Sequence, residues 1–106
     1  MRGMLAGMNI REVETVTELT AEMTGVWLVE TQGGQHLWDM DHGTYVRVPG
    51  RESLAGSMLG DYGANPIVSV DIFPKVGQSF LLWFEVDEIL VLHRMSSVVE
   101  RIEQLS

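Results

Sequence analysis

Residues Val26–Val48, VWLVETQGGQHLWDMDHGTYVRV, decide the fold because they alternate in three short runs around two turns. The glycines of Gln32-Gly33-Gly34-Gln35 supply the positive φ that a tight hairpin needs, and Asp41-His42-Gly43 supplies it again one run later. Pro49 ends the third run, since proline cannot donate a hydrogen bond to a neighbouring strand. The stretch therefore predicts an antiparallel three-stranded meander.

Three later apolar runs predict the rest of the sheet. Residues 67–73 alternate, whereas residues 79–84 and 88–95 contain the unbroken runs FLLWF and ILVL. Such runs are typical of central strands buried on both faces. About six strands joined by tight turns predict a mostly β fold, a small antiparallel barrel or half-barrel, since closure hides the sheet edges.

The two ends of the chain are ambiguous. Residues 9–22 place apolar side chains near helical spacing behind Asn9, although their valines and threonines also suit a strand; we expect a short helix. Ser97 and Glu100 match a capping box and predict a short C-terminal helix, with a closing strand over Val98–Ile102 as the alternative.

The chain divides into an N-terminal extension, residues 1–22, partly helical or loose, and a single β-rich domain, residues 23–106. Methionines that each offer a translation start precede the first clear strand: Met1, Met4, Met8 and Met23. Residues 51–66 contain glycines without periodicity and predict a long surface loop, which is the first place to look for binding.

Composition restricts the partners. The net charge is −8, which opposes binding to nucleic acid or to an anionic membrane surface, because both need Lys and Arg. The chain has no cysteine, so disulfides and thiolate zinc sites are excluded, and no apolar run is long enough for a membrane span. We expect a cytoplasmic protein without a cofactor.

Asp39, Asp41 and His42 form the most suggestive polar cluster, since two carboxylates and an imidazole at one turn can hold a divalent ion. The pattern lacks the remaining ligands of a calcium-binding loop, and Asp and Gly are also what a hairpin turn requires. The turn interpretation is therefore favoured, with these three residues as the weaker metal candidates.

The aromatic residues offer a binding surface. Core packing explains the three tryptophans, yet Trp38 with Tyr45 also suits an exposed patch on the meander, with Arg47 and Arg51 as a cationic rim. Neither a nucleophile elbow nor a phosphate-binding loop occurs, so nothing in the sequence supports an enzyme.

The pattern Trp27-x-Val29-x-Thr31, Asp39-x-Asp41, Gly43-Thr44, Arg47 and Pro49-Gly50 resembles small β-rich proteins of actinobacteria and their phages. The later Ser96-Ser97-x-Val99 resembles an element near the end of such proteins. The resemblance implies a small β-rich fold and a phage or mobile-element origin, and it implies no activity.

The leading functional hypothesis is a non-enzymatic module that binds another protein or associates with itself. The apolar run 88–95 would then leave a sheet edge that pairs in a dimer. One alternative is a phage-type inhibitor of a host protein, steered by its acidic charge. The other is a metal- or small-ligand-binding enzyme that uses Asp39, Asp41 and His42.

Overall fold

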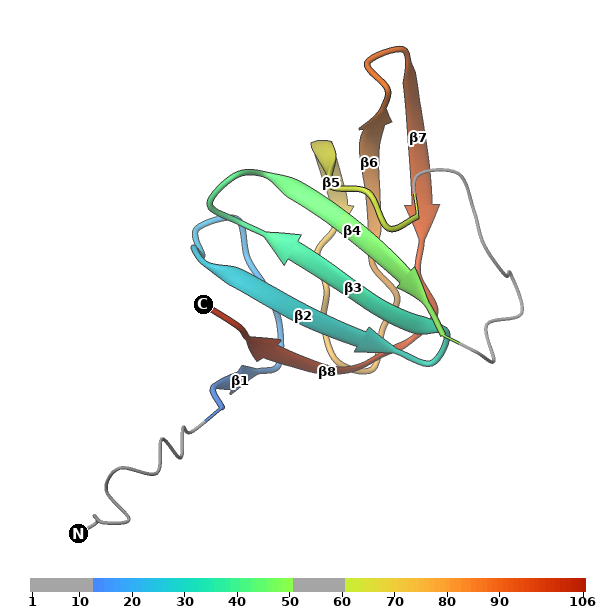
Figure 1. Ribbon diagram of the computed structural model, residues 1–106. Helices are drawn as coiled ribbons and strands as arrows, with labels where there is room; N and C mark the ends of the chain where they lie inside the picture. The colour runs from blue at the N-terminus through green and yellow to red at the C-terminus, as the bar shows by residue number, and fades with distance from the viewer. Residues whose placement is uncertain (1–12, 51–60) are drawn as a thin grey trace, which may run out of the picture.

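The structure is a computed structural model that describes residues 13–50 and 61–106, and within these ranges it is a single antiparallel sheet without a helix (Figure 1). The sheet order is β1-β8-β2-β3-β4-β5-β6-β7. The strands are β1 (Thr15–Val16), β2 (Val26–Thr31), β3 (Gly34–Asp39), β4 (Thr44–Pro49), β5 (Asn65–Ile72), β6 (Leu81–Val86), β7 (Leu90–Met95) and β8 (Val99–Gln104).

The predicted meander is confirmed. Strand β3 pairs along its whole length with β2 and with β4, and Trp38 lies opposite both Trp27 and Tyr45. Gly34 has a φ of 156°, and a Cβ placed on it would lie 2.6 Å from the carbonyl oxygen of Val48. The glycine is therefore required where the first turn crosses the end of β4.

The predicted closure and N-terminal helix are wrong, whereas the closing C-terminal strand, the alternative to a helix there, is confirmed by β8. Over the described residues the sheet has eight strands instead of six and does not close into a barrel. Residues 13–22 contain β1, which pairs with β8, and a bridge from Glu18 to Lys75, in place of the expected helix. The first part of that expected helix lies outside the described residues.

The C-terminal segment is a strand for a specific reason. Strand β8 is held between β1 and β2, and its register against β2 shifts where Glu30 faces Arg101 but Thr31 faces Val99. This bulge adds one residue to β8, so Val99 and Ile102 are both buried although they are three residues apart. A spacing that resembles a helical face is produced here by a bulged strand.

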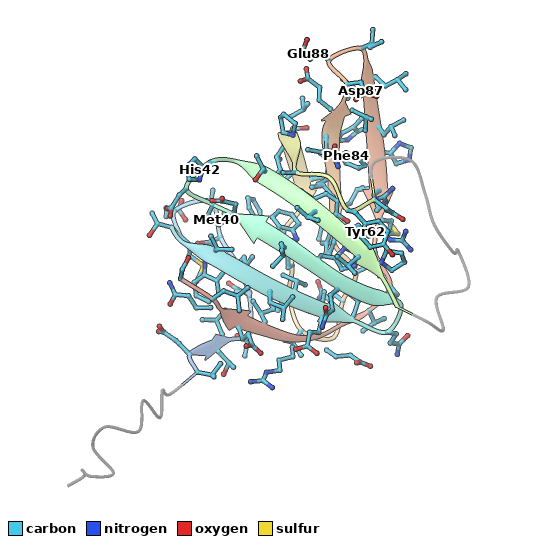
Figure 2. All side chains as sticks on the ribbon, viewed as in Figure 1. Met40, His42, Tyr62, Phe84, Asp87 and Glu88 are labelled. Atoms are coloured by element: carbon cyan, nitrogen blue, oxygen red, sulfur yellow. The ribbon has the colours of Figure 1, made fainter. Side chains whose placement is uncertain are left out.

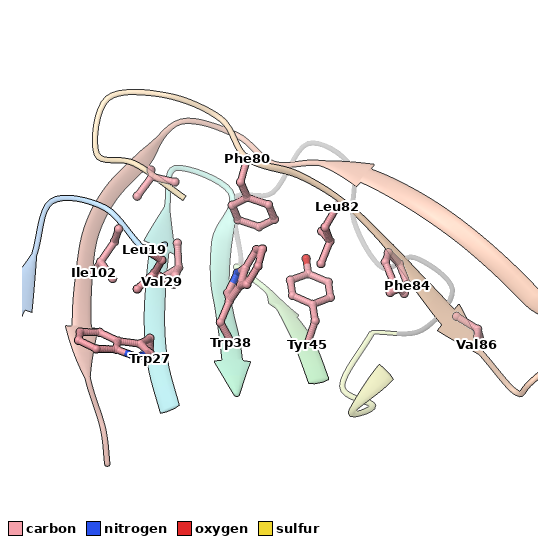
Figure 3. Packing of buried hydrophobic residues seen from close by; sticks show 11 residues of the cluster. Leu19, Trp27, Val29, Trp38, Tyr45, Phe80, Leu82, Phe84, Val86 and Ile102 are labelled. Carbon is pink, nitrogen blue, oxygen red and sulfur yellow. The ribbon is translucent and has the colours of Figure 1, made fainter. Parts of the chain in front are cut away.

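The core lies where β2, β3 and β4 face β6 and the chain segment that precedes it. Trp38, Tyr45, Phe80 and Leu82 meet at its centre (Figure 3). Phe80 packs edge-on against Trp38 at a ring-centroid separation of 5.1 Å. The buried apolar residues are Leu19, Trp27, Val29, Trp38, Tyr45, Phe80, Leu82, Phe84, Val86, Val99 and Ile102.

The last hairpin departs from the prediction of two fully buried strands. Strand β6 alternates, with Leu82 and Phe84 buried and Trp83 partly exposed. Strand β7 ends the sheet order and pairs, among the described strands, with β6 alone. Its upper part, together with that of β6, stands away from the β2–β3–β4 layer (Figure 1). The apolar character of β7 therefore does not correspond to burial.

Candidate functional site

The aromatic residues predicted to form an exposed patch are buried. Trp38 and Tyr45 have no exposed surface, and Arg47 is 6% exposed. Strand β4 turns its Tyr45 and Arg47 face toward the core, and Trp38 of β3 lies on the same face. Arg51 and residues 51–60 of the predicted loop lie outside the described residues. The expected patch is thus part of the interior.

A directed chain of hydrogen bonds runs through this interior. The Thr31 hydroxyl donates to the carbonyl oxygen of Gly34 at 3.2 Å, so its oxygen is left to accept from Nε2 of His36 at 3.3 Å. Nδ1 of His36 then accepts the hydroxyl proton of Tyr45, with 2.7 Å between the two atoms. The Tyr45 oxygen in turn accepts from Arg94. The chain of donors assigns His36 as the neutral Nε2–H tautomer.

The electrostatics agree with a neutral His36. Burial, together with the positive charges of Arg47 and Arg94, lowers the pKa of His36 to about 3. A second proton on Nδ1 would leave the Tyr45 hydroxyl facing two donors with no acceptor for its own proton. Burial raises the pKa of Tyr45 to about 12, although the hydrogen bond from Arg94 opposes this effect.

Asp61 links the two buried arginines. Its Oδ2 atom accepts a 2.6 Å hydrogen bond from Arg47, and its Oδ1 atom lies 3.5 Å from Nη1 of Arg94. All three side chains are less than 10% exposed, and the Arg94 guanidinium also lies 4.9 Å from the ring centre of Phe84. These two ion pairs join β4 to β7 through Asp61, which lies four residues before the start of β5. Asp61 and Arg94 were not predicted from the sequence, where the only signal was an arginine within an apolar run.

The Asp39-Asp41-His42 cluster forms a hairpin turn. Oδ1 of Asp39 accepts from the backbone N–H groups of Asp41 and His42, and Oδ2 lies 3.0 Å from Nδ1 of His42. These bonds lower the pKa of Asp39, the backbone N–H of His42 having the largest effect. Asp41 accepts from the backbone of Gly25. Over residues 13–50 and 61–106, no group of three or more His, Asp or Glu side chains is arranged to hold a metal ion.

A concavity of about 400 Å³ lies at the turn between β2 and β3. Among the described residues that line it, Glu30 is the one charged residue, and the others are uncharged. Thr31 reaches it, but His36, Tyr45, Arg47, Asp61 and Arg94 do not line it. The buried titratable groups lie apart from this concavity, and their bonds hold β3, β4 and β7 against one another.

Much of the exposed apolar surface of the described residues lies on the hairpin of β6 and β7, although Tyr62, Val68 and Val13 elsewhere are each more than half exposed. Ile89 at its tip is 82% exposed, and Met95 at the other end of β7 is 62% exposed. Between them, Leu90 and Val91 are each nearly half exposed. We define the hairpin surface as Trp83, Ile89, Leu90, Val91, His93 and Met95.

The hairpin tip is held in an unusual backbone conformation. Asp87 and Glu88 have φ values of 57° and 66°, a region that side chains other than glycine seldom adopt. Both project from the end of the hairpin beyond Phe84 (Figure 2). The six residue pairs of β6 and β7, from Leu81 opposite Met95 to Val86 opposite Leu90, keep the tip in place.

Among the described strands, β7 ends the sheet and contains neither the proline nor the lysine that often protects a sheet edge. Its arginine points inward to Asp61, and an inward-pointing charge is itself one of the protective features. By contrast, β1 at the other end of the sheet has only two residues. A six-residue edge that is apolar apart from His93 and Arg94 has the length to accept a further strand from another chain.

Comparison of the chain with protein-family models, curated proteins and solved structures gives no match. Within the described residues, no helix has the length and apolar character required to cross a bilayer.

Proposed function

We propose that this protein is a non-enzymatic interaction module, and that the hairpin surface binds a protein partner. The observation that carries the proposal is the position of β7, an apolar strand at the end of the sheet order with side chains exposed along its length. A strand added to this edge would bond to the β7 backbone and cover its apolar side chains.

The contrast between the buried titratable residues and the exposed apolar residues of the hairpin surface supports this proposal. The two titratable groups with the largest pKa shifts, His36 and Tyr45, are enclosed in the core, where they bond to protein atoms. The exposed side chains of the hairpin surface are mainly apolar. Large exposed apolar areas are typical of surfaces that contact other molecules, whereas catalysis needs accessible polar groups.

The test compares two exposed valines. Val91 on β7 is 49% exposed and Val13 near β1 is 51% exposed, so Val91→Lys and Val13→Lys make the same chemical change at matched positions. Val91 faces Glu85 across the β6–β7 pair, so a lysine there gains an opposite charge and should preserve the hairpin. The new charge on the edge should nevertheless oppose pairing with another strand.

We expect wild-type and Val13→Lys proteins to show the same association, measured by light scattering after size exclusion and by capture from a lysate of the encoding cells. Val91→Lys should lose it while its thermal unfolding stays close to wild type. A wild-type protein that is monomeric at high concentration and captures nothing in a Val91-dependent way would refute the proposal.

A further inference from the structure

We infer that the solvent-facing side of β6 binds lysine or arginine side chains of the protein partner, with the indole ring of Trp83 as the central contact. This inference rests on the proposed function and specifies the chemistry of the partner, which is a basic, extended segment. The site lies on a face of the sheet and not at its edge, so it does not depend on what pairs with the backbone of β7.

Trp83 differs from the other two tryptophans of the chain, which are buried, in being 36% exposed. It alternates along β6 with Leu82 and Phe84, whose side chains face the core, so its indole lies on the opposite face of the strand. The indole Nε1–H donates to Oδ2 of Asp71 on β5 at 3.1 Å. This hydrogen bond holds the exposed ring in one orientation.

The groups around Trp83 favour a positively charged ligand. His93 lies opposite it on β7, with 4.8 Å between the ring centroids, so the indole is supported from that side. The carboxylate of Asp71 that accepts the indole proton adds electron density to the ring, and the face of such a ring attracts a cation. Glu85 follows two residues later on the same face of β6 and supplies a second carboxylate.

The exposed charges of this part of the sheet have a single sign. Over β5, β6, β7 and the turn between β6 and β7, the acidic residues are Asp71, Glu85, Asp87 and Glu88. The one arginine of these strands, Arg94, is buried and directed to Asp61, and the strands contain no lysine. A basic partner is therefore attracted to this surface, whereas an acidic partner is repelled.

The spacing of these groups favours an extended partner. Trp83, Glu85 and Asp87 follow one another at intervals of two residues, and Asp87 lies at the projecting end of the hairpin (Figure 2). Side chains on one side of an extended peptide also recur every second residue. A segment with a basic residue at every second position can therefore present cations to the ring and to the acids that follow it.

The test uses the full chain and a fluorescein-labelled peptide in which lysine alternates with threonine, a residue that favours the extended conformation. A peptide with glutamine in place of lysine is the neutral control. Binding is measured by fluorescence anisotropy at low ionic strength. We expect the lysine peptide to bind at least about tenfold more tightly than the glutamine peptide, and added salt to reduce this difference because it screens exposed charges.

Variants of the site separate it from attraction by overall charge. Trp83→Leu removes the ring without changing the charge and should weaken binding of the lysine peptide about 2–5-fold, whereas Trp83→Phe keeps a ring and should weaken it less. Glu85→Gln and Glu100→Gln each remove one negative charge, the first beside Trp83 and the second on β8. Only Glu85→Gln should weaken binding, and thermal unfolding checks that each variant is folded.

Two results would overturn the cation site. One is equal affinity of the wild type for the lysine and glutamine peptides, a comparison that needs no variant to fold. The other is an equal effect of Glu85→Gln and Glu100→Gln, which is the result of attraction by net charge alone. If the site fails but Val91→Lys still loses its association, the proposed function stands and its partner is not basic. If Val91→Lys keeps its association, the proposed function fails whatever the peptides show.

Discussion

Acidification below neutral pH should destabilise this protein through His36. The imidazole is 3% exposed and its pKa is lowered to about 3, whereas an unfolded chain binds the proton at the ordinary value of 6.5. Between these two values the unfolded state holds more protons than the folded state. Stability therefore rises with pH across this window, and it falls as the pH drops below 6.5.

The magnitude at pH 5 depends mainly on the unfolded value, because pH 5 is well above the folded pKa of about 3. A difference of one pH unit corresponds to about 1.4 kcal/mol, and pH 5 lies about 1.5 units below 6.5. The expected loss of unfolding free energy between pH 7 and pH 5 is therefore about 2 kcal/mol. Carboxylates contribute little in this interval, since they titrate near pH 4.

The assay is urea unfolding at pH 7 and at pH 5 for the wild type, His36→Gln and His93→Gln. Glutamine at position 36 can donate to Thr31 and accept from Tyr45 without titrating. The unfolding free energy of His36→Gln should therefore fall by only a few tenths of a kcal/mol between pH 7 and pH 5. His93 is exposed, so its variant should keep the full loss. The reasoning fails if the wild type is equally stable at both pH values, or if His36→Gln loses as much as the wild type.

Three further predictions concern the core and the first turn. Asp61→Asn should cost about 3–5 kcal/mol of unfolding free energy, because it removes the anion facing two buried arginines, while Glu100→Gln on the exposed face of β8 should change little. Tyr45→Phe should lose about 1–3 kcal/mol at pH 7, since the hydrogen-bond chain is interrupted. In the wild type, burial raises the pKa of Tyr45 from 10 to about 12, so the unfolded state loses this proton at a lower pH than the folded state. The unfolding free energy of the wild type should therefore fall by ~1 kcal/mol between pH 9 and pH 11, and that of Tyr45→Phe should not show this fall. Gly34→Ala should lower the unfolding free energy by more than Gly43→Ala in the same assay. A Cβ at position 34 would lie 2.6 Å from the Val48 carbonyl oxygen, whereas none of the described atoms lies within 4 Å of a Cβ at position 43. Equal unfolding midpoints for the two variants would contradict the close approach at Gly34.

Much of the fold could be predicted because its signals are local. The alternation of β2, β3 and β4 and the glycines between them fix strand positions within a few residues, and the meander agrees with the prediction. The turn at Asp39–Gly43 was also predictable, since Asp39 bonds to its own neighbours.

The candidate site was harder to predict. Strand β7 is as apolar as a buried strand, and the prediction of burial on both faces followed from that composition. Its position at the end of the sheet depends on where β5 and β6 pair, which the residues of β7 do not encode. The contacts of Asp61 with Arg47 and Arg94 could not be predicted for the same reason, because these arginines are 14 and 33 positions away in the chain.

The sequence by itself determined the β class, the meander with its two turns, and the acidic charge, because side-chain period, glycine placement and composition act over a few residues. Tertiary structure decided which face of β4 is buried, that a bulge and not a helix brings Val99 and Ile102 to the core, and that an apolar strand ends the sheet. The reason is physical: burial is a property of the surroundings that the rest of the chain supplies, and the same leucines and valines serve a core or a contact surface equally well.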